Sequence, residues 1–449
     1  MNNSPFCCKR KPWVRNLVPR RGICLVWAMG MRGKGFSRTR NRVVITGMGV
    51  LAPNGTGLKA FWKSLLAGES GIGPITLFDA TGLSSRIAGE VKEFDPDDYF
   101  EPKMKPKRMA RHTQLAYAAT MLALKDAGLD PEHLQLPSPT PVVVGVSTSA
   151  LDVIERVFEH VSADRPDRIS PFALGASKPQ AAANVIAERI GASASASTIS
   201  SACPSGLDAV ATAASMIARG EAEFAIAGGA DAPVSPLAIA SFAASGMSSV
   251  RNAEPQTASR PFDLTRDSGV ISEGAGIFTL ENLECAEARG ARSYCEITGF
   301  NMQRDTAPDQ PASGLEQSMR LALSNAGCVP TDVDYISAYG PGHPALDAAE
   351  IAVIKKVFGQ HAYEISISSI KGVTGNPLAA AGPFQIISCA LSFRDQILPP
   401  TANYEHPDPA CDLDVVPNYS RKAKVSRALV NVRGLGGSAS TMVLERLAS

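Results

Sequence analysis

Two stretches of the chain resemble each other closely at a separation of 199 residues: "LALKDAGLDPEHL" begins at Leu122 and "LALSNAGCVPTDV" begins at Leu321. In each, the spacing of apolar residues predicts a helix that ends at a glycine, Gly128 or Gly327, as a helix C-terminus prefers. A strand-like run follows each helix, "PVVVGVSTS" in one case and "DYISAYG" in the other. The chain therefore reads as an α/β unit that occurs twice.

Other segments extend the repeat. "RVVITGMGV" is answered by "CEITGFNMQ", and "FAIAGGAD" (224–231) is answered by "ALVNVRGLGGSAS" (428–440). The alternation of strand and helix patterns predicts βαβ units and mainly parallel sheets. The alternative to a duplicated unit is that apolar αβ segments resemble one another by chance. We expect three parts: a basic leader at residues 1–41, an N-terminal half at 42–290 and a C-terminal half at 291–449.

A third pair of matched segments contains candidate catalytic residues. "TISSACPSGLDAVATAASMIARG" and "SSIKGVTGNPLAAAGPFQIISCAL" each combine a strand, a turn of small residues and an alanine-rich helix. Cys203-Pro204 in the first corresponds to Asn376-Pro377 in the second, and each proline suits the first helical position. If a pseudo-dyad relates the halves, Cys203 and Asn376 face one another across a central site.

The position of Cys203 suits a nucleophile. A thiol at a helix N-terminus lies at the positive end of the helix dipole, which favours the reactive thiolate. Its small neighbours leave room for a substrate carbonyl, and a backbone amide is available for an oxyanion. This context indicates a covalent thioester on Cys203, with a purely structural cysteine as the alternative.

Charge and composition exclude several classes of function. Residues 1–42 hold eleven Lys and Arg and no acid, so the rest of the chain has 33 basic against 43 acidic residues and a net charge of −10. Such a body should not bind nucleic acid non-specifically. No run of 18 apolar residues predicts a membrane span. The nine cysteines lack metal-ligand spacing, which argues against a metal site and suits a reducing cytosol. The leader is either a disordered tail, an over-extended start or a targeting segment.

Six motifs in order carry a family resemblance. They are "SSACPSG", "AGGADAPVSPLAIASFAASGMSS", "ASRPFDLTRDSGVISEGAGIFTLE", "AYGPGHPALDAAE", "SSIKGVTGNPLAAAG" and "NVRGLGGSAS". From about Arg42 to Leu447 the chain resembles the β-ketoacyl-acyl-carrier-protein synthases of the I/II branch. The resemblance implies a thiolase-like fold, in which two pseudo-dyad-related βαβαβαββ halves form α-β-α-β-α layers. It also implies a cytoplasmic acyltransferase of fatty-acid or polyketide biosynthesis.

The same resemblance implies partners and ligands. Acyl groups would arrive on the phosphopantetheine of an acyl carrier protein or on CoA, with no tightly bound cofactor and no metal. The subunit would form a homodimer, or a heterodimer with another ketosynthase-like chain. The segment "EPKMKPKRMARH" (101–112) offers basic residues to an acidic carrier protein, with a solvated helix face as the alternative.

The site residues follow by matching motifs. The family's nucleophile matches Cys203 and its lysine matches Lys371, while Asp347 and Glu350 match the acids that fix the active-site loop and that lysine. The glycine-rich gate matches residues 434–437, where Leu435, followed by Gly436, replaces a usual phenylalanine. By analogy, the amides of Cys203 and Leu435 would form the oxyanion hole.

Both catalytic histidines of the family are missing. Tyr339 stands at the first position and Asn376 at the second, while His343, four residues after Tyr339, is either a substitute or a loop-structuring residue. Because one preorganised donor is worth about 3–4 kcal/mol to an oxyanion, a Cys-Tyr-Asn site suits acyl loading and leaves decarboxylation open.

Four further departures lie near these motifs. Pro204 follows the nucleophile, Ser268 and Ser272 replace glycines, and Arg433 replaces an aromatic residue beside the gate. Arg433 either pairs with Glu273 or another acid, or contacts an anionic substrate.

Three functions remain open. The chain condenses an acyl group with a malonyl carrier, loads Cys203 without elongation, or serves as a chain-length-factor-like partner of an active synthase. The missing histidines argue against the first, and the retained Cys203 argues against the last.

Overall fold

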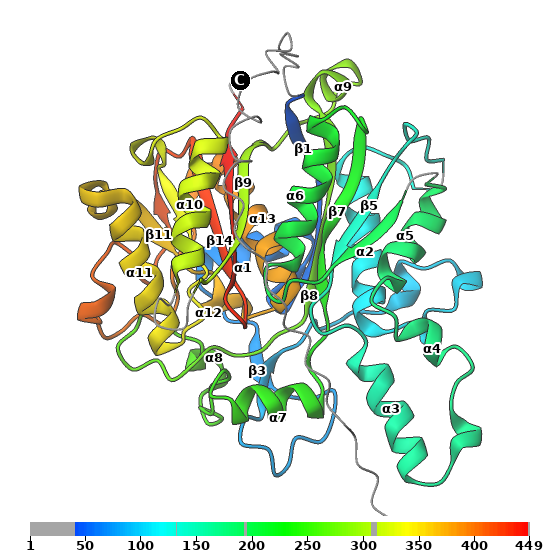
Figure 1. Cartoon of the computed structure of the whole chain (residues 1–449). Coiled ribbons are helices and arrows are strands. Elements are labelled where there is room, and N and C mark those ends of the chain that lie inside the picture. Colours follow the sequence, from blue (N-terminus) through cyan, green and yellow to red (C-terminus); the bar gives the residue numbers. More distant parts are fainter. Residues whose placement is uncertain (1–40, 132, 193–194, 307–311, 448–449) are drawn as a thin grey trace, which may run out of the picture. The chain divides into compact units, whose positions relative to one another are not determined.

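The computed structural model describes residues 41–131, 133–192, 195–306 and 312–447 (Figure 1). The predicted basic leader lies outside these residues, apart from Asn41. The body from Arg40 onward forms one compact unit. Within the described ranges, no helix is both long and apolar enough to cross a membrane.

The repeat in the sequence becomes a repeat in the main sheet, whose two halves have the same strand order. From the edge inward, the first half has β6 (Ala196–Ile199), β5 (Val142–Gly145), β7 (Phe224–Asp231), β8 (Gly274–Asn282) and β1 (Val43–Ala52). The second half has β11 (Ser366–Ser368), β10 (Tyr335–Ser337), β14 (Arg427–Arg433), β15 (Ser438–Glu445) and β9 (Cys295–Arg304). The halves meet where β1 pairs with β9.

Strand directions match as well. In each half the outer three strands are parallel and the inner pairings are antiparallel. The prediction of mainly parallel sheets is therefore wrong. In the second half the reason is local, because only residues 434–437 separate β14 from β15, and so short a connection forces an antiparallel pair. Short strands complete the set: β2 (Gly55–Thr56), β3 (Ile72–Pro74), β4 (Ile87–Gly89), β12 (Ile397–Leu398) and β13 (Arg421–Lys422).

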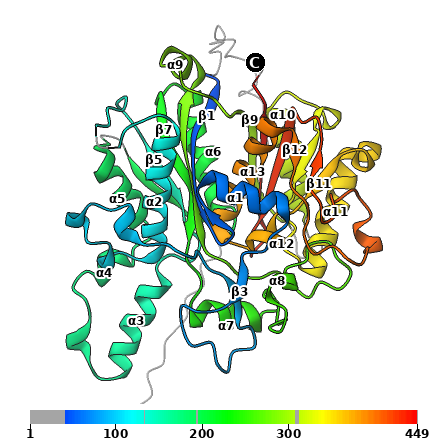
Figure 2. The same cartoon turned by 180° about the vertical axis from the view of Figure 1, so that it is seen from behind.

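Helices form three layers around the two half-sheets (Figures 1 and 2). The central layer contains α6 (Ser205–Ala218) and α13 (Ala381–Asp395), and α13 is apolar on nearly every side because sheets and helices surround it. The outer layers contain α2 (Arg111–Asp126) and α5 (Ala181–Ile190) on one side, and α10 (Ser313–Asn325) and α11 (Pro344–Phe358) on the other. The predicted α-β-α-β-α arrangement is confirmed.

The remaining helices connect or flank these layers. They are α1 (Gly57–Ala67), α3 (Leu151–Ser162), α4 (Ala173–Ala176), α7 (Pro236–Ala244), α8 (Pro255–Ala258), α9 (Leu283–Ala288) and α12 (Lys371–Thr374).

The repeated "Ile-Thr-Gly" explains how closely an outer helix approaches each half-sheet. A Cβ added to Gly47 in β1 would lie 2.3 Å from the Ala123 carbonyl oxygen of α2. A Cβ added to Gly299 in β9 would lie 2.4 Å from the Ala322 oxygen of α10. The two helices therefore rest on bare backbone at equivalent points, which only glycine permits.

We predict that Gly47→Ala and Gly299→Ala each destabilise the fold by about 1–3 kcal/mol, because the added methyl group overpacks a rigid contact. The free energy of unfolding from chemical denaturation measures the effect. Gly175→Ala is the matched control, since its added Cβ meets no atom within 4 Å and it lies in the short helix α4. A loss of stability in the control as large as in the two test variants would contradict this account.

Candidate active site

Cys203 lies in a strained turn between β6 and α6. Ala202, just before it, has φ of +66°, a left-handed conformation that costs energy in a non-glycine residue. The Ser205 hydroxyl fixes the turn by accepting the Ser201 amide and donating to the Ala202 carbonyl. Pro204 occupies the N-cap, so α6 starts one residue later than predicted. The turn leaves Cys203 buried, with 5% exposure.

The second half of the chain supplies the groups that face this thiol. Tyr339 follows β10, and its hydroxyl donates a hydrogen bond to Cys203 Sγ at 3.6 Å. The Asn376 side chain lies beside the same phenol and acts to lower its pKa, while its backbone amide and carbonyl are fixed by Val270 and Ser272. The structure thus brings Cys203, Tyr339 and Asn376 together across the pseudo-dyad.

The side-chain Nζ atom of Lys371, close to this trio, has no hydrogen-bond partner among the described residues. This atom is 4.7 Å from the centre of the Tyr339 ring. Burial lowers the pKa of Lys371 to about 8, although Glu350 and Cys203 oppose the shift. The ammonium therefore provides a positive charge beside the site that can lose its proton near neutral pH.

Glu350 and Asp347 hold the loop that carries Tyr339. Glu350 accepts the amides of Tyr339 at 2.9 Å and Gly340 at 2.8 Å. Asp347 accepts the amides of Gly342 and Phe262 at 3.1 and 2.9 Å. Burial raises the pKa of Glu350 and raises the pKa of Asp347 to about 7. These acids therefore orient backbone, as the motif match implies.

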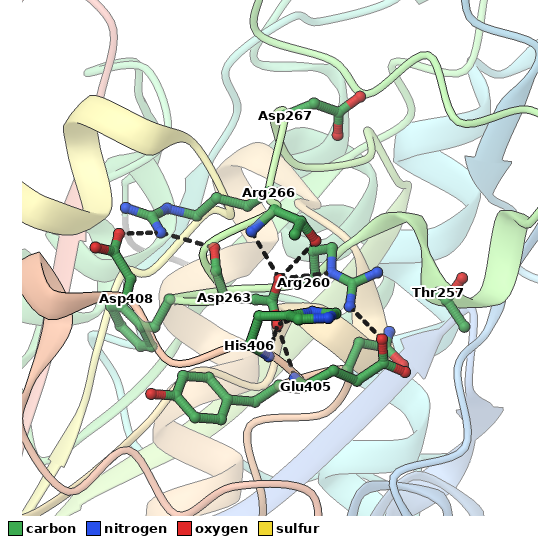
Figure 3. Close-up of polar contacts among 12 residues, drawn as sticks. Thr257, Arg260, Asp263, Arg266, Asp267, Glu405, His406 and Asp408 are labelled. Atoms are coloured by element: carbon green, nitrogen blue, oxygen red, sulfur yellow. Dashed lines mark hydrogen bonds and ion pairs between the residues drawn. The ribbon is translucent and has the colours of Figure 1, made fainter.

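Arg266 supports the same loop and was missed in the sequence. Its guanidinium donates to the Pro344 carbonyl at 3.0 Å and lies 3.4 Å from Asp347 and 2.6 Å from Asp408. Figure 3 shows it in a cluster of acids and arginines that joins two long connections. Arg266 lies within the family motif "RPFDLTRDSG", which could have marked it as a site residue, but the motif does not indicate which acids it contacts.

His343 forms the N-cap of α11. Its Nδ1 atom accepts the amides of Ala345 at 3.2 Å and Leu346 at 3.4 Å, and burial together with Arg266 lowers its pKa. Since Nδ1 of His343 caps the helix, this geometry favours the loop-structuring role over the role of a substitute for a catalytic histidine.

The electrostatics of Cys203 differ from the expectation of a stabilised thiolate. Burial raises the pKa of its thiol, and this exceeds the lowering by the Tyr339 hydrogen bond and by Lys371. The protein therefore keeps the resting thiol protonated. The Tyr339 hydroxyl and the Lys371 charge favour the thiolate against that trend.

The Gly434–Gly437 loop packs directly on the nucleophile turn. A Cβ added to Gly434 would lie 2.9 Å from Pro204 and 3.0 Å from Ala202. Neither the Cys203 amide nor the Leu435 amide donates to another described residue. Leu435, followed by Gly436, is 52% exposed at the tip of this loop.

Arg433 pairs with Asp305, so the expectation of Glu273 as its partner is wrong and the alternative of another acid holds. Glu273 instead accepts two hydrogen bonds from Arg111, both at 2.6 Å. Arg111 and Glu273 are 162 residues apart in the chain, so no local pattern in the sequence indicates the pair.

The basic segment 101–112 is not a helix face but two 3₁₀ turns that lead into α2. Lys105, Lys107 and Arg108 are exposed, and Lys103 is exposed but paired with Glu101. Arg111 is withdrawn from the surface by its pair with Glu273. Elsewhere in the described chain, no group of three or more His, Cys, Asp or Glu side chains is placed to hold a metal.

Comparison with known proteins identifies the family. The model of the β-ketoacyl synthase N-terminal domain matches residues 40–286, and that of the C-terminal domain matches residues 294–405. The chain belongs to the β-ketoacyl synthases. Its fold is the thiolase-like fold of this family, and the family's enzymes are transferases of fatty-acid and polyketide synthesis.

Individual relatives agree along almost the whole chain. The 3-oxoacyl-[acyl-carrier-protein] synthase 2 of Coxiella burnetii is 40% identical over 91% of this chain and 99% of its own. The tetracenomycin polyketide synthase ketoacyl synthase alpha subunit of Streptomyces glaucescens is 38% identical over 90% and 97%. Among solved structures, the ishigamide ketosynthase/chain length factor has a TM-score of 0.85 and 33% identity over 91% and 100% of the two chains.

We predict that Tyr339→Phe raises the pKa of Cys203, because the thiolate loses its hydrogen-bond donor. The rate of iodoacetamide alkylation at Cys203 should rise steadily from pH 7 to 9 in the unaltered protein and be about tenfold lower at each pH in the variant, as expected for a hydrogen bond to a charged group. Tyr335→Phe is the control, since Tyr335 is equally buried but bonds Ser368. Identical profiles for Tyr339→Phe and the unaltered protein would refute the role of the hydroxyl.

Proposed function

We propose that this β-ketoacyl synthase accepts an acyl group on Cys203 and condenses it with a malonyl group delivered by an acyl carrier protein. The observation that carries the proposal is the contact between the Tyr339 hydroxyl and Cys203 Sγ, formed by residues from opposite halves of the chain. A thiol aligned with a donor and beside two free amides is suited to acyl transfer.

Loading is a transthioesterification. Cys203 Sγ attacks the carbonyl carbon of the incoming thioester, and the oxyanion forms against the amides of Cys203 and Leu435. The bond to the pantetheine sulfur then breaks, and that sulfur takes the proton that Cys203 releases. Tyr339 and Lys371 assist by stabilising the thiolate, which the buried site otherwise disfavours.

Condensation needs stabilisation of an enolate. When the malonyl carboxylate leaves as carbon dioxide, the electron pair of the broken bond passes to the enolate, whose oxygen requires donors. Tyr339 has a pKa well above its ordinary value because it is buried, so its O–H stays intact as a neutral donor, and the Asn376 amide is a second. The enolate carbon then attacks the acyl carbonyl and Cys203 leaves as thiolate.

Loading without elongation is the second candidate, and one observation favours it: no imidazole stands at residue 339 or 376. A chain-length-factor-like role beside an active synthase is the third candidate. One solved relative is titled a ketosynthase/chain length factor.

The partners and location follow from the family. An acyl carrier protein would bring the acyl group on phosphopantetheine, or CoA would, with no tightly bound cofactor. One structural neighbour, at 33% identity and a TM-score of 0.82, is a type II polyketide synthase acyl carrier protein in complex with its ketosynthase. The exposed Lys105, Lys107 and Arg108 suit an acidic carrier. A homodimer or heterodimer in the cytoplasm completes the proposal.

A two-step assay tests the function. We expect an acyl carrier protein charged with saturated acyl groups to transfer acyl mass to Cys203, and Cys203→Ser to abolish that transfer. Addition of malonyl carrier should then release carbon dioxide and yield a β-ketoacyl product. Loading without carbon dioxide would exclude condensation and leave the second candidate. Failure to load would leave only the partner role.

Substitution of histidine at residue 339 or 376 tests how well Tyr339 and Asn376 stabilise the enolate. We predict that Tyr339→His or Asn376→His increases carbon dioxide release relative to loading, because an imidazole can carry positive charge near neutral pH. The ratio of the two rates within each variant separates this effect from a general loss of activity. A ratio that stays unchanged in both variants would show that the phenol and amide already supply the stabilisation.

A further inference from the structure

Arg433 is a buried cation with unused hydrogen-bonding capacity. It ends β14 and its side chain is 9% exposed, paired with Asp305 through Nη2 alone. Its Nε and Nη1 atoms are buried and have no hydrogen-bond partner among the described residues. Buried donors of a charged group rarely stay unsatisfied in a resting protein unless a ligand is to meet them.

The position of Arg433 places those donors beside the nucleophile. The next residue, Gly434, packs on Ala202 and Pro204 of the Cys203 turn. Two residues earlier on the same face of β14, Asn431 donates to Glu350, which holds the Tyr339 amide. Arg433 therefore lies where the 434–437 loop closes over the site, just beyond the supports of Tyr339.

The loop itself can uncover the guanidinium. Gly436 and Gly437 have φ of +83° and +85°, so this stretch uses conformations that glycine samples freely. Two bonds tie it to the end of β9: Arg304 donates to the Gly436 carbonyl at 3.2 Å and the Asp305 amide donates to the Gly437 carbonyl at 2.9 Å. Movement of the loop would expose Arg433 and its neighbour Asp305 together.

We propose that Arg433 binds the free carboxylate of a malonyl-type thioester through one of its two free donors, Nε or Nη1. This inference rests on the proposed function and names the group that recognises the extender. A guanidinium suits a carboxylate because several N–H groups share one plane and one charge. Asp305 pairs with the Nη2 atom of Arg433. This ion pair orients the guanidinium and partly neutralises its positive charge.

Such a contact binds substrate more than it speeds the reaction. The carboxylate is the group that leaves as carbon dioxide, so its bond to Arg433 is lost as the enolate forms. An interaction present in the ground state and lost in the transition state lowers KM and also lowers kcat, because its loss adds to the activation barrier. Arg433 therefore selects a dicarboxylic thioester over its monocarboxylic counterpart.

A binding experiment tests the contact without turnover. The probes are the amide analogues of malonyl-pantetheine and acetyl-pantetheine, which cannot acylate Cys203, and the readout is protection of Cys203 from iodoacetamide. In the unaltered protein we expect the malonyl probe to protect at about tenfold lower concentration than the acetyl probe, as one charge-assisted hydrogen bond provides. Arg433→Gln should abolish that difference.

Two further variants make the result decisive. Arg320→Gln removes an exposed cation of α10 that does not touch the 434–437 loop and should keep the malonyl preference. Asp305→Asn frees Arg433 from its acid and should strengthen the preference, whereas a purely structural ion pair predicts that Asp305→Asn and Arg433→Gln behave alike. A preference retained in Arg433→Gln, or equal losses in Arg433→Gln and Asp305→Asn, would overturn the proposal. Since neither probe is turned over, failure of acyl loading would leave this test readable.

Discussion

The close approach of two helix N-termini at the pseudo-dyad is the constraint on which the site depends. A Cβ added to Gly206 of α6 would lie 2.1 Å from the Ala379 carbonyl oxygen, and one added to Gly229 of β7 would lie 2.3 Å from the same atom. Asp231 completes the junction, because it accepts the Ala379 amide at 3.0 Å as well as amides of its own half. The turns that carry Cys203 and Asn376 can meet only because Gly206 and Gly229 have no side chain at this point of contact.

Burial at that junction sets the electrostatics of the site. The pKa of Lys371 falls to about 8, while those of Asp347 and Asp231 rise to about 7 and about 6. Desolvation is the leading cause in each case, and each shift moves the group toward its neutral form. Tyr339 and Asn376 are themselves uncharged donors. The site therefore has a low net charge. When a thiolate or an enolate forms there, its negative charge is the main charge that the surrounding groups stabilise.

The sequence predicts the parts of this structure that repeat or that follow local rules. The helices ending at Gly128 and Gly327, the strands after them and the meeting of Cys203 with Asn376 all follow from matched segments. The strand directions do not, because they depend on the short connection between β14 and β15 rather than on strand composition. The sequence also does not predict the partner of Arg433, since Asp305 is 128 residues away and only the folded sheet places the ends of β9 and β14 on either side of β15. The expectation of a lowered pKa for the Cys203 thiol was wrong. The sequence shows that Cys203 lies at a helix N-terminus, but it does not show that the thiol is buried.

The unusual residues of the site fit one another. Pro204 packs against Gly434, and a Cβ at Gly269 would lie 2.2 Å from the Pro341 carbonyl oxygen of the Tyr339 loop. Ser272 donates its amide to the Asn376 carbonyl, which fixes that residue beside the phenol. Glu350 is bonded to two loop amides, and the Cys203 thiol is held in a strained turn. Tyr339 and Asn376 are thus the donors that this framework places beside Cys203.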